Sequence, residues 1–168
     1  MTTALAATIA ISLAASYSNS LDIGSVNYQP NFNSNFVFND GIGANQAKIL
    51  FTDTRTLAAS ANESLDLAGV LLDAFGNTII FDRIKAIIVT ADPTNTNNVL
   101  FGGAATAQAA PWFGTVTDTL VVRPGGCIAL IAPDAVGYDV TATTADLIKI
   151  ANSGAGTGVN YTIVIVGV

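Results

Sequence analysis

Hydrophobic and polar residues alternate with a period of two over most of the chain, which is the pattern of β-strands that bury one face. β-branched residues, which favour a pleated surface, are frequent at the hydrophobic positions. Turn residues separate the alternating stretches, as is typical of an all-β sandwich or barrel. Seven stretches show this pattern: 7–15, 48–57, 64–93, 99–104, 118–134, 138–152 and 159–168. Some of them contain a turn and so more than one strand, and together they predict about eight strands.

Glycine and proline mark the predicted turns. Residues 73–77 (DAFGN) form one turn, in which Gly76 is free to take a positive φ. Residues 124–126 (PGG) form another turn between two strands. Residues 65–75 (LDLAGVLLDAF) also carry a helical pattern, which Gly69 weakens, so a short helix is an alternative there.

The strongest alternation indicates where the core lies. It places two sets of side chains on opposite faces of one strand: Ile84, Ala86 and Ile88 on one, Arg83, Lys85 and Ile87 on the other. The tightest core is expected in 84–89, 127–131 and 163–166. Cys127 is therefore expected to act as a small buried hydrophobe.

The first 45 residues differ from the rest. Residues 3–15 are apolar, but they lack the positive charge of a signal peptide and are too short to span a bilayer, so they are interpreted as a strand. Residues 27–46 are rich in Asn and Gly and indicate a loop or extended segment. We therefore predict an N-terminal arm with one strand (1–45) and a β-sandwich body (46–168). Four aromatic residues of the arm are expected to dock onto a partner: Tyr28, Phe32, Phe36 and Phe38.

The composition argues for a surface that is covered by other molecules. Charged residues make up only 11% of the 168 residues, hydrophobic residues make up 51%, and the mean hydropathy is +0.53. A free monomer normally stays soluble through many interspersed charges. The net charge of −6, without a cluster of Lys and Arg, argues against nucleic acid and anionic membranes as partners. We expect a homo-oligomer.

The residues of common catalytic and metal sites are missing from the sequence. There is no His, one Cys and one Glu, Glu63, and the Asp residues are scattered among turn formers. This composition rules out the common His-dependent triads and Cys-rich metal clusters. Residues 92–98 (DPTNTNN) offer oxygens for Ca²⁺ but lack the spacing of a dedicated loop, so a polar turn is expected. We predict no enzyme activity, no cofactor and no metal.

Two further motifs, residues 154–158 and residues 112–113, could each be a binding site or a purely structural feature. Residues 154–158 (GAGTG) look like a phosphate-binding loop, but strand patterns flank them on both sides and no Walker lysine follows. They are predicted to form a flexible hairpin loop. Trp112 and Phe113 are interpreted as core or interface residues, and a sugar-binding platform is the alternative for Trp112.

The body, from about Ala47 to Val168, resembles small structural proteins of tailed bacteriophages. The phrases that carry the resemblance are DAFGNTI, RPGG, IAPD and IANSGAGTGVNY. The resemblance implies a jelly-roll-like β-sandwich in the virion, with decoration or cement of the capsid, often as a trimer, as its typical role. The first 45 residues carry no resemblance.

Two functional hypotheses follow. In the first, the chain is a homotrimeric cement protein on the capsid surface that stabilises the head through contacts with the major capsid protein. Its interface residues are expected to be the four arm aromatics together with Trp112 and Phe113. In the second, the chain is a tail fibre-head or receptor-binding module for host polysaccharide, with Trp112 and Phe113 in the sugar site.

Overall fold

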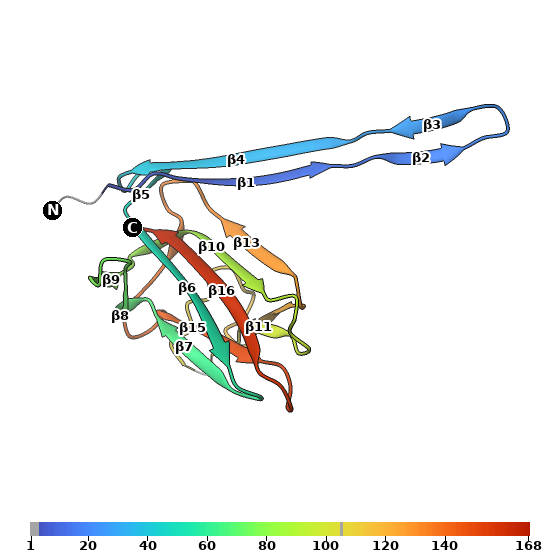
Figure 1. Cartoon of the computed structure of the whole chain (residues 1–168). Coiled ribbons are helices and arrows are strands. Elements are labelled where there is room, and N and C mark those ends of the chain that lie inside the picture. Colours follow the sequence, from blue (N-terminus) through green and yellow to red (C-terminus); the bar gives the residue numbers. More distant parts are fainter. Residues whose placement is uncertain (1–3, 105) are drawn as a thin grey trace.

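The computed structural model describes residues 4–104 and 106–168 and shows a β-sandwich from which a long, narrow β-hairpin projects (Figure 1). The predicted all-β sandwich class is confirmed. The described residues contain no helix, so the helical alternative at 65–75 is wrong, and strands occupy most of that stretch.

The strands follow one another from the projecting hairpin into the body. They are β1 (Ala7–Ala14), β2 (Tyr17–Ser20), β3 (Ser25–Tyr28), β4 (Asn31–Asp40), β5 (Gln46–Ala47), β6 (Ile49–Leu57), β7 (Asn62–Asp66), β8 (Ala68–Leu72), β9 (Thr78–Ile80), β10 (Arg83–Ala91), β11 (Val99–Gly102), β12 (Thr119–Val122), β13 (Cys127–Ile131), β14 (Tyr138–Asp139), β15 (Leu147–Asn152) and β16 (Val159–Gly167).

Two antiparallel sheets form the sandwich. Sheet I has the strand order β13-β10-β16-β6, with β14 added beside β10, and sheet II has the order β12-β11-β15-β7. The first long strand of the body, β6, therefore lies beside the last, β16, and β7 lies beside β15 in the other sheet. Such an order, with two interlocked Greek keys, is that of a jelly roll.

The core fills the space between the two sheets. Sheet I contributes Ile87, Ile163 and Ile165, and sheet II contributes Phe101 and Ile150, all of them fully buried. Each is one of every second residue along its strand, as the period-two pattern predicts. Burial of a side chain of this size stabilises the fold by about 1.5–3 kcal/mol.

A β-bulge in β10 makes part of the predicted assignment of its side chains to the two faces of the strand wrong. The pairing of β10 with β16 shifts register between Ile84 and Ala86. Because a bulge adds one residue to one strand, it reverses the alternation beyond that point. Ile84 and Ile87 therefore both contact the core between the sheets, whereas Ala86 faces outward. The period-two pattern of the sequence alone predicts Ile84 on the same face as Ala86.

The expectation for Cys127 and its strand is also wrong. Strand β13 is an edge strand of sheet I, and Cys127 is exposed, while Ile128, Leu130 and Ile131 are only partly buried. The apolar run resembles that of a central strand, but one side of an edge strand has no neighbour to cover it.

The glycine run, residues 154–158, connects one sheet to the other and is not the hairpin loop that the sequence predicts. It joins β15 of sheet II to β16 of sheet I, so the two flanking strands do not pair. The Asn97 side-chain amide donates to the carbonyl oxygens of Gly154 (3.2 Å) and Thr157 (3.1 Å), and Gly156 has a φ of +97°. The run therefore closes one end of the sandwich.

The turn at 73–77 forms as predicted. The Asp73 carboxylate accepts hydrogen bonds from the backbone N–H groups of Phe75 and Asn77, both at 2.8 Å, and Gly76 has a φ of +81°. This turn joins β8 and β9, which form a small antiparallel hairpin at one side of the sandwich (Figure 1).

The arm contains more strand than predicted. Instead of one strand followed by a loop, it is a hairpin in which β1 pairs with β4 and β2 pairs with β3. The Asn-rich composition around β4 indicates a loop or extended segment, but the aromatic residues there alternate as in a strand. The chain exposes 9327 Å², against about 7,800 Å² for a compact protein of this mass, and the projecting arm accounts for the excess.

The loop that follows β13 supports the base of the arm. The Asp134 carboxylate accepts hydrogen bonds from the backbone N–H groups of Val136 and Gly137, both at 2.7 Å. These two bonds hold the pKa of Asp134 below its ordinary value of 3.8. The backbone N–H of Asn45, at the end of the arm, donates to Pro133 O at 2.7 Å, and the buried Lys85 ammonium donates to Asp134 O.

We expect Asp134→Asn to lower the melting temperature at pH 7 and to weaken the acid sensitivity of the fold. The pKa of Asp134 is depressed in the folded chain, so its contribution is complete above pH 3.8 and is lost as the pH falls through the lower folded pKa. Thermal melts between pH 2 and pH 7 measure both effects. Asp22→Asn, at the exposed arm tip, is the control, and equal behaviour of the two variants would contradict the assignment.

Candidate interaction surface

The arm is a two-stranded ribbon that keeps one register from its base to its tip. Ala7 lies opposite Phe38, Leu13 lies opposite Phe32, and Tyr17 lies opposite Tyr28. In every one of these pairs the two residue numbers add up to the same value, so no residue is inserted along the ribbon. Directly opposite residues share a face.

This register collects the large apolar side chains on one face. We call that face the apolar arm face, and its members are Ala7, Ile9, Ile11, Leu13, Tyr17, Val26, Tyr28, Phe32, Phe36 and Phe38. The other face carries mostly small and polar residues, among them Thr8, Ser12, Ser18, Asn27, Asn33 and Asn35. The four aromatics expected to dock thus lie in one line.

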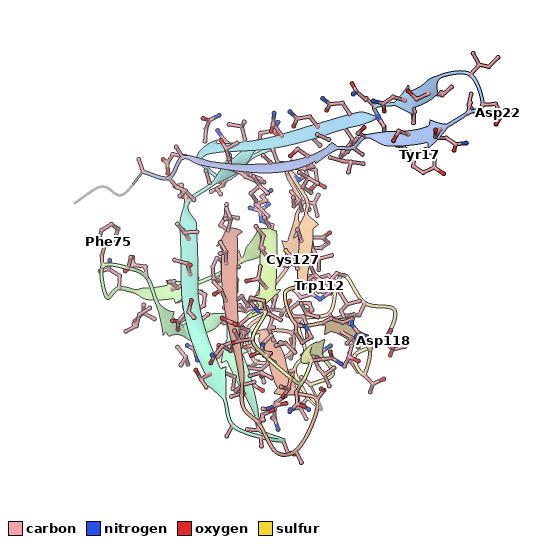
Figure 2. All side chains as sticks on the ribbon, turned by 45° about the vertical axis from the view of Figure 1, so that its right-hand side comes forward. Tyr17, Asp22, Phe75, Trp112, Asp118 and Cys127 are labelled. Carbon is pink, nitrogen blue, oxygen red and sulfur yellow. The ribbon has the colours of Figure 1, made fainter. Side chains whose placement is uncertain are left out.

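The body covers only the base of the apolar arm face. Phe38 is 0% exposed and forms a cluster with Ala47, Ala86 and Val166, against which Phe36 also packs. Farther out, exposure rises: Phe32 is 56% exposed and Tyr28 is 65% exposed. Figure 2 shows the ribbon extending beyond the body, with Tyr17 and Asp22 on its outer part.

The arm base rests on the outer face of sheet I, the face turned away from sheet II. Paired residues form three rows across the four strands of this face. In order away from the arm base, they are Ile131–Ala86–Val166–Leu50, Ala129–Ile88–Val164–Thr52 and Cys127–Thr90–Thr162–Thr54. None of these side chains is charged, and the last two rows are only partly covered.

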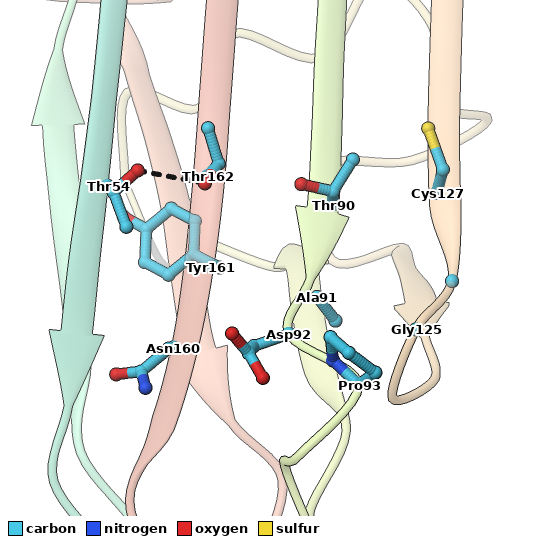
Figure 3. Close-up of a pocket in the computed structure, with 11 residues that line it drawn as sticks. Thr54, Thr90, Ala91, Asp92, Pro93, Gly125, Cys127, Asn160, Tyr161 and Thr162 are labelled. Atoms are coloured by element: carbon cyan, nitrogen blue, oxygen red, sulfur yellow. Dashed lines mark hydrogen bonds between the residues drawn. The ribbon is translucent and has the colours of Figure 1, made fainter.

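A hollow of about 360 Å³ lies at the third row (Figure 3). Its lining includes Thr54, Thr90, Cys127 and Thr162, together with Asp92. The hydroxyl groups of Thr54 and Thr162 lie 2.9 Å apart and bond to each other. The hollow therefore has small side chains and hydroxyl groups on its floor and an open thiol at one edge.

Trp112 and Phe113 lie apart from the arm and help to close the sandwich core. Both are partly buried, and Trp112 stacks on Phe101 at 5.8 Å and meets Tyr138 edge-on at 5.4 Å. The indole Nε1 is buried without a hydrogen-bond partner in the structure. The structure thus places these two predicted interface residues in a different region from Tyr28, Phe32, Phe36 and Phe38.

The most tightly connected charged groups link the two sheets. Arg55 of β6 donates to Glu63 of β7 at 2.5 Å, and the Tyr161 hydroxyl of β16 donates to the other Glu63 oxygen at 2.8 Å. Burial, followed by the bond to Glu63, raises the pKa of Tyr161 far above its ordinary value. Burial lowers the pKa of Arg55, but the hydrogen bond and charge of Glu63 outweigh this effect. This network fastens sheet to sheet.

The structure does not gather acidic side chains into a metal site. Among the described residues, no three His, Cys, Asp or Glu side chains lie close enough together to hold a metal ion. The Asp92 carboxylate accepts hydrogen bonds from the backbone N–H and hydroxyl groups of Thr94, which keeps its pKa below the ordinary value. Within residues 4–104 and 106–168, no helix has the length and hydropathy to cross a membrane.

Comparisons with known proteins do not place the chain in a family. No protein family and no curated protein matches it. Two solved structures match weakly. The first, from the disulfide-linked pili described as Bacillus endospore appendages, shares 17% identity and a TM-score of 0.37, over 71% of this chain and 86% of that one.

The second is IMPa from Pseudomonas aeruginosa in complex with an O-glycopeptide. It shares 13% identity and a TM-score of 0.36, over 70% of this chain and 12% of that one. At these TM-scores, neither likeness carries a conclusion about the fold or the function of this chain.

We expect Phe38→Ala to release the arm from the body. Truncation of a buried Phe costs about 3–5 kcal/mol, and the loss falls on the only described cluster that joins the apolar arm face to sheet I. Proteolysis within the arm should become faster by at least about 100-fold, while the body melts within a few degrees of the unaltered chain. The rate of cleavage and a thermal melt measure the two effects.

The control is Val37→Ala, because the exposed Val37 side chain lies on the opposite face of the same strand. Equal cleavage rates in the two variants would show that Phe38 does not hold the arm.

Proposed function

We propose that this chain is a structural protein of a bacteriophage virion, a capsid decoration or cement protein that stabilises the head shell as an oligomer. The observation that carries the proposal is the arm, which keeps a line of large apolar side chains exposed in a chain with few charges. A two-stranded ribbon is marginally stable by itself in water. An arm of this kind is stable when another molecule covers it, as happens in a built particle.

The distribution of charge supports the same role. Up to Asn39, the arm contains a single side chain that is charged at neutral pH, Asp22, which lies at the tip. Interfaces that hold permanent assemblies together are depleted in charged residues and rich in aromatic ones. The acidic residues of the body would lie on the outer surface of finished particles, where like-charge repulsion prevents the particles from associating. The resemblance of residues 47–168 to small phage structural proteins points to the capsid and the major capsid protein as the setting.

The second hypothesis, a receptor-binding module for polysaccharide, depended on Trp112 as an open platform. Trp112 stacks on Phe101 and packs against Tyr138, and it is only partly exposed. No observation on the described residues favours this hypothesis over the first.

We expect a chain with a shortened arm to lose its hold on capsids. In the variant, Asn-Gly replaces residues 15–30, which keeps the register of β1 with β4 and closes the hairpin with a favoured turn. Co-sedimentation with shells of the major capsid protein should retain the unaltered chain and not the variant. Thermal melts should be the same, since the arm base stays intact.

The control is Asn33→Ala on the polar face of β4, which should bind shells as the unaltered chain does. If the shortened variant binds shells equally well, the arm has no part in the function. If the unaltered chain does not bind shells at all, the cement proposal fails.

A further inference from the structure

We infer that the free half of the apolar arm face docks on the outer face of sheet I of a second copy of this chain. The inference deepens the proposed function, on which it rests only for the assumption that the chain assembles. It names the partner of the arm and the surface on which the arm lies.

The first argument is that the two surfaces already fit one another within one chain. At the arm base, Phe36 and Phe38 pack on Ala86, Val164 and Val166 of sheet I. The same two surfaces continue beyond this contact: the apolar arm face runs on through Phe32 to Tyr28, and the sheet face runs on through its second and third rows. The apolar arm face and the second row of the sheet thus repeat the apolar chemistry of a contact that the chain makes, and the third row continues it with uncharged Thr and Cys.

The second argument is charge. Neither the apolar arm face nor the three rows of the sheet face contains an ionisable group other than the Cys127 thiol and the two arm tyrosines. All Lys and Arg residues lie elsewhere in the chain. A strongly charged partner would gain nothing from such surfaces, whereas a second copy brings the complementary uncharged surface with it.

The third argument is size. The exposed members of the apolar arm face are Ile11, Leu13, Tyr17, Val26, Tyr28 and Phe32. With roughly 200 Å² for each large side chain, slightly more than half of it exposed, they offer on the order of 600–700 Å². A stable interface needs about 800 Å² from each partner, which the small residues between them complete.

The length of the arm permits the contact. From Ala7 to Ser20 the ribbon is about 45 Å long, and its outer part projects clear of its own body (Figure 1). The outer face of sheet I is four strands wide, which is about 19 Å. The free part of one arm is therefore long enough to cross this face on a neighbouring copy.

The contact is heterologous, because the arm of one copy contacts the outer face of sheet I of another copy, and not its arm. Such contacts close into a ring when the rotation between copies permits it. The trimer that the resemblance to phage structural proteins implies is one such ring.

Chemical cross-linking tests the inference, with the natural Cys127 as the probe on the sheet face. Tyr28→Cys adds a second thiol on the apolar arm face, and a short bismaleimide joins thiols that lie close together. Asn27→Cys is the matched control, since Asn27 lies next along β3 and on the polar face. Within one chain, the arm tip projects away from Cys127, so a link between these positions joins two copies (Figure 2).

We expect the Tyr28→Cys chain to give at least ten-fold more linked dimer than the Asn27→Cys chain. Peptide mapping should assign the link to positions 28 and 127. Adding Cys127→Ser should abolish the link, because the second thiol is then removed. A link that persists after Cys127→Ser joins arm to arm and overturns the inference. Equal yields of linked dimer from the Tyr28→Cys and Asn27→Cys chains also overturn it.

A charge placed on the sheet face gives an independent readout. Thr162→Lys, in the middle of the third row, should reduce self-association at least ten-fold in light scattering of the purified chain, with a melting temperature within a few degrees of the unaltered chain. Thr144→Lys, in an exposed loop outside sheet I, is the control and should associate normally.

Failure of the inference is distinguishable from failure of the proposed function. A chain that binds capsid shells but stays monomeric in solution, or that links arm to arm, overturns the docking inference but not the attachment of the chain to the capsid. A chain that forms the link between positions 28 and 127 but does not bind capsid shells supports the inference and overturns the cement proposal.

Discussion

The constraint on which the arm depends is its unbroken antiparallel register. Because β1 with β4 and β2 with β3 follow one register, every aromatic side chain of the ribbon falls on the same face, from Phe38 at the base to Tyr28 near the tip. A ribbon has only two faces, and its own body covers the apolar one just at the base. Beyond the base, the apolar arm face is exposed in the single chain. The assembly proposed above rests on this pairing of strands and not on a reactive group.

The body serves as a rigid support for this arm. Its two sheets enclose a core of alternating residues, and the Arg55–Glu63–Tyr161 network ties β6, β7 and β16 together. The bulge in β10 turns Ala86 outward, where it receives Phe38, and leaves Ile84 and Ile87 in the core. The loop after β13 holds the end of the arm through Pro133 and Asn45. Core packing and arm placement are therefore coupled through one irregular strand.

Much of the fold was accessible to sequence reasoning, and its failures have common physical causes. Period-two alternation located β6, β10 and β16, and the local chemistry of Asp73 and Gly76 predicted their turn. The bulge at Lys85 and the edge position of Cys127 were missed, because both depend on which strands become neighbours. The loop at 154–158 joins two sheets instead of forming a hairpin for the same reason. Strand partners are chosen by contacts distant in sequence, which local patterns do not record.

The sequence by itself determined the class of the fold, the scarcity of charge and the presence of aromatic residues at every second or fourth position of the arm, since these are properties of residue order alone. The tertiary structure decided that the arm is a hairpin, that its aromatics share one face, and that Trp112 and Phe113 belong to the core instead. Whether a residue faces water or protein depends on which strand lies opposite it and which sheet lies beneath it, and only the folded chain settles both.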